Sequence, residues 1–192
     1  MKLPRRTFLT TAVAALVPLP ASALAGQPAR IGDPVPPFTA TSVQGEEVSL
    51  ESLIREHKAL VVLFTSTVCP YANYFASHVR ELSETYQSRG VHFLGVNSNN
   101  WESRQDVADH LRERGFTFPM LKDERHEIAD RFGATRTPEA FVVDAAGRLR
   151  YRGWVKSKQG SPDLQRAIDD VLDGRTVRRP VTKAFGCAVD RS

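Results

Sequence analysis

Apolar residues occur in two patterns along this chain: short continuous runs, and residues spaced three or four positions apart. The continuous run at 59–64 (ALVVLF) is typical of a strand that is buried on both faces. Residues 91–96 and 139–143 are two further strand candidates. Between and around these runs, apolar residues spaced three or four positions apart predict helices. The predicted helices are 50–57, 71–89, 101–114, 124–132 and 161–172.

Shorter segments complete the predicted order of elements. Residues 38–49 suggest two short strands around a Gln-Gly turn, and 116–121 is short and extended. Residues 148–154 form a strand that pairs back across a turn. Ser161 is expected to cap the last helix, with Pro162 at its first position. Strands thus alternate with helices before a hairpin and a final helix, which predicts an α/β domain with a mixed central sheet flanked by helices.

The N-terminal segment reads as an export signal. Residues 1–25 begin with basic side chains, continue with an apolar stretch rich in small residues, and end in Ala-Leu-Ala before Gly26. That pattern is typical of a secretory signal peptide. Residues 4–10 (PRRTFLT) also resemble a twin-arginine export signal, with an ordinary secretory signal as the alternative. A periplasmic or secreted bacterial protein is therefore expected.

The rest of the chain divides into three predicted parts. Residues 26–37 are rich in Pro and Gly and form a connecting arm, 38–174 hold the domain, and 175–192 form a tail with little periodicity. No apolar run of about 18 residues predicts a membrane span, so no stable membrane insertion is expected after signal cleavage.

Charge does not indicate a nucleic-acid partner. The chain carries 26 basic and 22 acidic side chains, a net charge of +4. Residues 1–25 hold three basic and no acidic side chains, so the chain without them has 23 basic and 22 acidic groups, or +1. So small a net charge supports neither nucleic-acid binding nor attraction to a membrane surface.

The candidate chemistry centres on Cys69, one of only two cysteines. It follows a predicted buried strand and precedes a predicted helix, where unpaired N–H groups and a partial positive charge favour a thiolate. Pro70 suits the first turn of that helix. A thiolate is the nucleophile for disulfide exchange and for attack on a peroxide. The alternative is an inert buried cysteine that only packs in the core.

Three segments carry a resemblance to a known family. Residues 61–71 (VVLFTSTVCPY) resemble the active-site strand and loop of the thioredoxin-like superfamily. Residues 135–144 (TRTPEAFVVD) resemble its Thr-Pro before a strand, and 147–153 resemble the hairpin that follows. Together with Gly186-Cys187, the pattern over residues 31–189 is most similar to the redoxin or peroxiredoxin-like branch, related to alkyl hydroperoxide reductase and thiol-specific antioxidant proteins.

This resemblance implies a thioredoxin-like fold and a thiol-dependent oxidoreductase. No organic cofactor is implied, and the partner is a thiol or disulfide protein reductant or a small hydroperoxide. The Thr137-Pro138 bond is expected to be cis, beside the nucleophile, and to offer backbone to an extended thiol substrate. Pro70 and Tyr71 are expected to line the same substrate cleft.

Departures from the family pattern narrow the mechanism. Thioredoxins carry a second cysteine where this chain has Ala72, and copper chaperones of the superfamily carry one at the position of Asn73. No nearby disulfide can form, and no metal site is predicted. Ser66 fills the Thr/Ser position of the peroxiredoxin motif, where its hydroxyl is expected to hydrogen-bond the peroxide or the thiolate. Val62 replaces the proline of that motif, which weakens a peroxidase interpretation.

Two further residues complete the predicted site. Peroxiredoxins place an arginine near the thiolate; Arg136 is the candidate here, or else a solvated loop residue. Cys187, on a mobile tail, is predicted to swing onto Cys69 and resolve its oxidised form. A structural disulfide, an intermolecular disulfide and an inert thiol remain alternatives for Cys187. A non-catalytic binding module and a metallochaperone remain alternatives for the whole protein.

Overall fold

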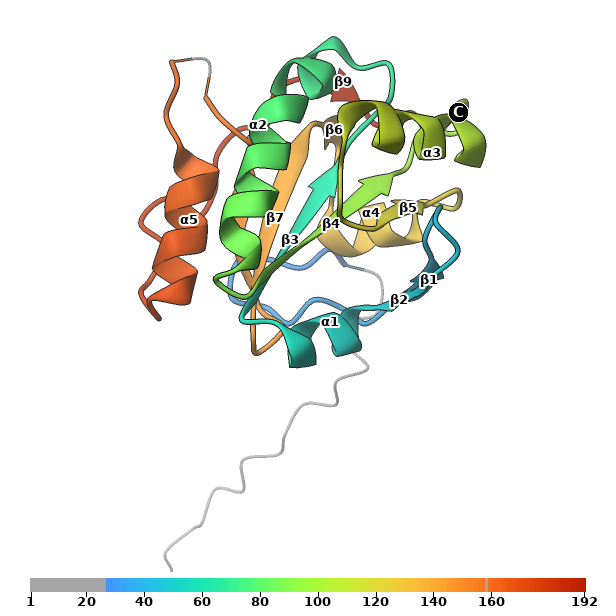
Figure 1. Cartoon of the computed structure of the whole chain (residues 1–192). Helices are drawn as coiled ribbons and strands as arrows, with labels where there is room; N and C mark the ends of the chain where they lie inside the picture. The colour runs from blue at the N-terminus through green and yellow to red at the C-terminus, as the bar shows by residue number, and fades with distance from the viewer. Residues whose placement is uncertain (1–26, 158) are drawn as a thin grey trace, which may run out of the picture.

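The computed structural model describes residues 27–157 and 159–192 (Figure 1). The predicted signal peptide and twin-arginine motif lie outside these residues. Within the described ranges, no helix is both long and apolar enough to cross a membrane.

The centre of the fold is a mixed sheet of five strands in the described part of the chain, ordered β5-β4-β3-β7-β8. β3 lies in the middle, parallel to β4 and antiparallel to β7, as the predicted mixed sheet requires. The continuous apolar run of β3 is buried at every position because helices cover both faces of the sheet. The strands are β3 (Ala59–Phe64), β4 (Val91–Asn97), β5 (Met120–Lys122), β7 (Glu139–Asp144) and β8 (Leu149–Gly153).

Helices cover both faces of this sheet (Figure 1), and an apolar cluster packs against each face. Val61 and Leu63 of β3 pack into one cluster with residues from α2, α3 and α5. Leu60 and Val62 face the other way and pack with residues from α1 and α4. The alternation follows from the two-residue period of a strand. The helices are α1 (Leu50–Glu56), α2 (Pro70–Gln87), α3 (Arg104–Arg114), α4 (Glu127–Phe132) and α5 (Asp163–Leu172).

Three helix starts differ from the prediction. α3 begins at Arg104, because Ser103 and Asp106 form a reciprocal capping box, and Trp101 lies outside the helix. α4 begins at Glu127 rather than 124. α5 begins at Asp163 with Pro162 as its N-cap, so the predictions of Ser161 as the cap and Pro162 as the first helical residue are both wrong. Apolar spacing places the body of a helix but not its first residue; the capping box decides the start of α3, whereas the N-cap residues of α4 and α5 make no side-chain cap hydrogen bond.

Two small sheets flank the central one. The predicted hairpin at 38–49 forms β1 (Thr39–Thr41) and β2 (Glu47–Ser49). The second pairs β6 (Arg136–Thr137) with β9 (Cys187–Ala188). The expectation of a tail without regular structure is therefore wrong at β9, and Figure 1 shows β9 at the same end of the molecule as the start of α2.

Candidate active site

Cys69 lies at the junction of the central strand and the longest described helix. It is the N-cap residue of α2, with Pro70 at the first helical position. Cys69 is only 1% exposed, and its Sγ donates a hydrogen bond to the carbonyl oxygen of Thr137 at 3.0 Å. The Thr137-Pro138 peptide bond is cis, as predicted. The nucleophile candidate therefore rests against the backbone that precedes this proline.

Cys187 lies directly beside this contact. In the β6–β9 pair, Cys187 is opposite Thr137 and Ala188 is opposite Arg136. Both cysteines are free thiols and interact through their sulfur atoms. Two cysteines that are 118 positions apart in sequence thus meet at Thr137, which binds Cys69 through its carbonyl and pairs with Cys187 across the strands.

The pKa values of the two thiols are shifted in opposite directions. Burial alone would raise the pKa of Cys69, but hydrogen bonds from the Cys187 thiol and from the Ala72 backbone outweigh it, and the pKa lies below its ordinary value. Burial and the neighbouring Cys69 sulfur raise the pKa of Cys187 to about 11, against the opposing charge of Arg136. The arrangement favours a thiolate on Cys69 and a thiol on Cys187.

The segment that carries Cys187 is also bound immediately after β9. The Val189 N–H donates to the Thr135 carbonyl at 3.1 Å, and the Asp190 N–H donates to Asn99 Oδ1 at 2.8 Å. Arg191 forms an ion pair of 2.7 Å with Asp130 of α4. The predicted mobile tail that swings onto Cys69 is therefore not what the structure contains. Cys187 is already at the site, because pairing with β6 holds it there.

A glycine makes this close approach possible. Gly186 has a φ of +141°, and a Cβ atom at this position would collide with the carbonyl oxygen of Thr137. This is the same carbonyl that binds Cys69. Any side chain at position 186 would push β9 away from β6.

Ser66 does not contact the Cys69 sulfur as the sequence suggested. Its hydroxyl donates to Glu102 Oε1 at 2.6 Å, and its oxygen accepts the N–H groups of Val68 at 3.3 Å and Cys69 at 3.2 Å. Asn73, at the position of the chaperone cysteine, donates to the Thr67 carbonyl at 2.9 Å. Both side chains therefore brace the loop that ends at Cys69.

Arg136 lies beside Cys187 rather than Cys69. It is exposed, and its guanidinium is 3.5 Å from the Gly186 carbonyl oxygen. Its positive charge lowers the pKa of Cys187, where burial has the larger, opposite effect. The expectation that it chiefly activates Cys69 does not match this position.

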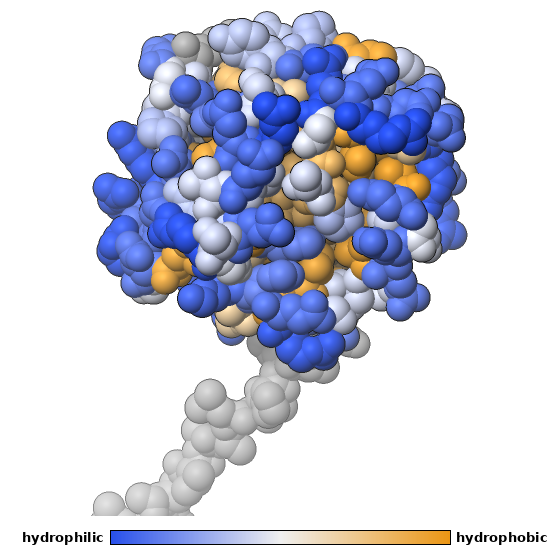
Figure 2. Space-filling model, in the orientation of Figure 1, coloured by the Kyte–Doolittle hydropathy of each residue, from blue (hydrophilic) through white to orange (hydrophobic). Residues whose placement is uncertain are grey.

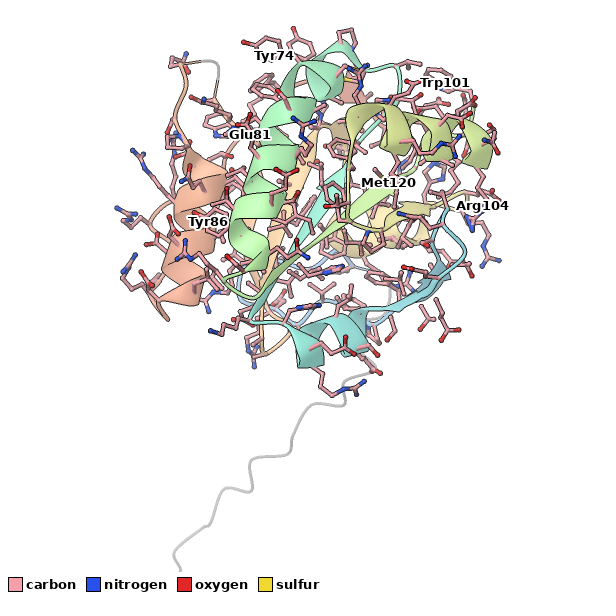
Figure 3. All side chains as sticks on the ribbon, in the orientation of Figure 1. Tyr74, Glu81, Tyr86, Trp101, Arg104 and Met120 are labelled. Atoms are coloured by element: carbon pink, nitrogen blue, oxygen red, sulfur yellow. The ribbon has the colours of Figure 1, made fainter. Side chains whose placement is uncertain are left out.

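Pro70 and Tyr71 line an open cleft of about 790 Å³ along α2. Its wall includes Tyr74, Phe75 and Phe185, and the Tyr71 and Phe185 rings meet edge-to-face at 5.7 Å. Tyr74 is 77% exposed. Figure 3 shows Tyr74 and Trp101 at the same end of the molecule, and Figure 2 shows apolar patches among hydrophilic side chains on this view.

Glu102 is the main residue of the site that sequence reasoning missed. It is 1% exposed and accepts four hydrogen bonds, from Ser66, Thr67, Asn97 and Asn99. A signal was available: polar residues follow β4, and the carboxyl ends of neighbouring parallel strands gather functional groups. Across the described residues, no group of three or more His, Cys, Asp or Glu side chains is arranged to hold a metal ion.

Comparison with known proteins identifies the family of this chain. The model of a family described as AhpC/TSA matches residues 31–152, well over half of the chain. The chain belongs to the AhpC/TSA family. This confirms the resemblance to redoxins and alkyl hydroperoxide reductases at family level.

Individual relatives of this AhpC/TSA member fall in two groups. The thiol-disulfide oxidoreductase ResA of Halalkalibacterium halodurans is 26% identical over 63% of this chain and 66% of its own length, just under two thirds. The peroxiredoxin Bcp of Escherichia coli K12 is 23% identical over 65% of this chain and 85% of Bcp.

A solved structure extends the likeness to the fold. A thiol:disulfide interchange protein of the thioredoxin family from Chlorobium tepidum TLS has a TM-score of 0.63 and 27% identity, covering 75% of this chain and 98% of that one. The thioredoxin-like fold predicted from the sequence is confirmed.

Proposed function

We propose that this protein is a thiol-dependent oxidoreductase in which Cys69 and Cys187 cycle between dithiol and disulfide. One observation carries the proposal: β9 pairs with β6 so that Cys187 lies opposite Thr137, whose carbonyl binds Cys69. The unequal acidities of the two thiols support the roles of nucleophile for Cys69 and second cysteine for Cys187. The names of the relatives, a thiol-disulfide oxidoreductase and a peroxiredoxin, agree with this class of reaction.

Disulfide exchange is the leading reaction. The Cys69 thiolate attacks one sulfur of a substrate disulfide, forms a mixed disulfide and releases the other substrate sulfur as a thiolate. Cys187, after losing its proton to that thiolate or to water, attacks the Cys69 sulfur and releases the second substrate thiol. The substrate is reduced, and the Cys69–Cys187 pair is oxidised. An external dithiol then reduces the pair. Pro70 and Tyr71 contact the substrate along the cleft, and the Thr137-Pro138 backbone guides it to Cys69.

Peroxide reduction is the second candidate, supported by the AhpC/TSA match and by the relative named peroxiredoxin. Here Cys69 takes the outer oxygen of a hydroperoxide, becomes a sulfenic acid and releases an alcohol or water. The Cys187 thiol condenses with it and water leaves. Disulfide exchange ranks first because Ser66 and Arg136, expected to assist a peroxide, are engaged with Glu102 and Gly186.

The place of action follows from the N-terminal pattern. We infer that residues 1–25 direct export, so that the cysteine pair works in the periplasm or outside the cell. An oxidising compartment allows a Cys69–Cys187 disulfide to persist between encounters with a reductant.

Mass spectrometry of the reduced protein tests the proposal. One equivalent of cystamine, in one arm, or of hydrogen peroxide, in another, is added and peptides are mapped. We expect a Cys69–Cys187 disulfide in both arms, forming faster with cystamine at equal concentration. A stable mixed disulfide or sulfenic acid on Cys69 would instead indicate that Cys187 takes no part. Absence of reaction with either reagent would contradict the enzyme and favour a binding module.

A further inference from the structure

Glu102 lies beneath the site as a buried and fully hydrogen-bonded carboxylate. Oε1 accepts from the Ser66 hydroxyl and from Asn99 Nδ2, both at 2.6 Å. Oε2 accepts from the Thr67 N–H at 2.6 Å and from Asn97 Nδ2 at 2.8 Å. Four donors leave no room for a proton on either oxygen, so the group is held as an anion.

One chain of hydrogen bonds connects this anion to the nucleophile. Glu102 orients the Ser66 hydroxyl, and the Ser66 oxygen accepts the backbone N–H of Cys69. The Thr67 N–H binds the other carboxylate oxygen. Glu102 therefore holds the loop from β3 to α2 at two points immediately before Cys69.

A second chain connects the same anion to the segment of Cys187. Asn99 donates through Nδ2 to Glu102, and its Oδ1 accepts the backbone N–H of Asp190 at 2.8 Å. Asp190 follows the two residues of β9 closely in the chain. One carboxylate thus connects to both cysteine-bearing segments through single intervening side chains.

Charged or titratable side chains lie around Glu102 and Cys69 in the described part of the chain, among them Lys122, His110, Cys187 and Arg136. The Lys122 ammonium of β5 binds Asn97 Oδ1 at 3.1 Å and the backbone carbonyl oxygen of Asn99, and so joins the two residues whose side-chain amides bind Glu102. The Glu102 charge also acts to raise the pKa of His110 of α3 and of Cys187 of β9, and the Arg136 charge of β6 acts to lower the pKa of Cys187. Lys122 is the compensating cation for an otherwise isolated buried anion.

We propose that Glu102 is a positioning residue that holds the Cys69 loop and the Cys187 strand in one geometry, so that the pair forms its disulfide rapidly. The inference rests on the proposed dithiol–disulfide cycle. Glu102 touches neither sulfur atom and acts through Ser66, Thr67 and Asn99.

Glu102→Gln is the decisive variant. A glutamine side chain has one oxygen in place of two, and its NH₂ group would face donors among the four groups that now donate to Glu102. Two quantities are measured: the rate of Cys69–Cys187 disulfide formation after one equivalent of cystamine, and the pH midpoint of Cys69 alkylation. We expect disulfide formation about tenfold slower, a smaller loss than the roughly hundredfold that a misplacement of about 1 Å can cause. We also expect a midpoint at higher pH, because Cys69 loses part of its hydrogen bond from Cys187.

Asp170→Asn is the matched control. Asp170 is also a buried carboxylate at 1% exposure, but its partners are Arg175 and Arg178 beside α5, outside this network. We expect Asp170→Asn to lose stability with both readouts unchanged. If Glu102→Gln behaves in the same way, Glu102 has only a structural role. A midpoint at lower pH would show that Glu102 acts through its charge, and would also overturn the proposal.

Asn99→Ala decides the matter if Glu102→Gln does not fold. It breaks the link to Asp190 and leaves the hydrogen bonds from Ser66 and Thr67 to Glu102. We expect slower disulfide formation with an unchanged first reaction of Cys69; a rate equal to that of the unaltered protein would contradict the coupling. If the unaltered protein forms no Cys69–Cys187 disulfide, the proposed function fails instead, which separates the two failures.

Discussion

The two cysteine-bearing regions of this protein are built in opposite ways. Cys69 lies between the central strand and α2, in a loop whose bracing residues lie mostly nearby in the chain. Cys187 lies in a two-residue strand whose partner, β6, is about fifty residues away. The first region is placed by local structure and the second by long-range pairing. The pKa values of the two thiols differ because the two sulfur atoms are neighbours. In a thioredoxin-type pair, the two cysteines are neighbours because they lie within one helical turn.

Replacing each cysteine tests this division most strongly. We expect Cys69→Ser to lower oxidoreductase turnover by at least about a thousandfold, because the nucleophile is lost. Cys187→Ala should keep the first reaction of Cys69 with cystamine and lose later turnovers. Single-turnover and steady-state assays measure the two steps. Equal losses at both steps in Cys187→Ala would contradict the separate roles.

Displacing β9 without changing either cysteine should have a smaller effect. We expect Gly186→Ala to slow formation of the Cys69–Cys187 disulfide at least about tenfold, because the added methyl collides with the Thr137 carbonyl oxygen. Gly174→Ala is the control: it shares a positive φ, of +67°, but a Cβ there meets no atom within 4 Å. Quenched-flow alkylation follows the rate. Similar rates in the two variants would show that the pairing of β9 does not set the geometry.

The pH dependence of Cys69 measures how much Cys187 contributes to its acidity. The pKa of Cys69 is lowered despite burial, so alkylation should reach half its maximal rate below the pH usual for a cysteine. Cys187→Ala removes a hydrogen-bond donor to the Cys69 sulfur, and the midpoint should rise. Iodoacetamide kinetics between pH 5 and about 10, mapped to Cys69, provide the measurement. An unchanged midpoint would assign the acidity to the helix and backbone alone, and a fall would show that Cys187 raises the pKa of Cys69.

A histidine far from both cysteines should affect stability without affecting the site. His92 lies near the start of β4, the opposite end from Asn97, and stacks on His57 at 4.7 Å. Burial, with the His57 charge, lowers the pKa of His92 to about 4. The unfolded chain gains a proton near pH 6.5 and the folded chain only near pH 4. The full shift corresponds to about 3 kcal/mol, and because His92 is partly exposed to solvent we expect the free energy of unfolding to fall by about 2 kcal/mol as the pH falls through this window.

Urea unfolding at several pH values tests this last expectation. His92→Leu should flatten the dependence and leave the alkylation midpoint of Cys69 unchanged. A shifted midpoint would mean that the sheet transmits the change to the site.

Local patterns were sufficient for most of the fold. The apolar run of β3 and the helical spacing after Pro70 placed Cys69 and α2 correctly, and the family resemblance of the Thr-Pro before β7 predicted the cis bond. The first residues of α3 and α5 were misplaced: the capping box of α3 depends on side-chain geometry rather than on period, and α5 begins at Asp163 without a side-chain cap. The roles expected of Ser66 and Arg136 came from family resemblance, and their observed partners, Glu102 and Gly186, are not adjacent in sequence.

By itself, the sequence determined the layered α/β fold and the position of a cysteine at the start of a helix. Both follow from the periods of strands and helices, which are short-range properties of the chain. Only the tertiary structure decided where Cys187 lies and what Glu102 does. A two-residue strand carries no period to detect, and a buried glutamate in a polar loop resembles a solvated one until its four donors converge.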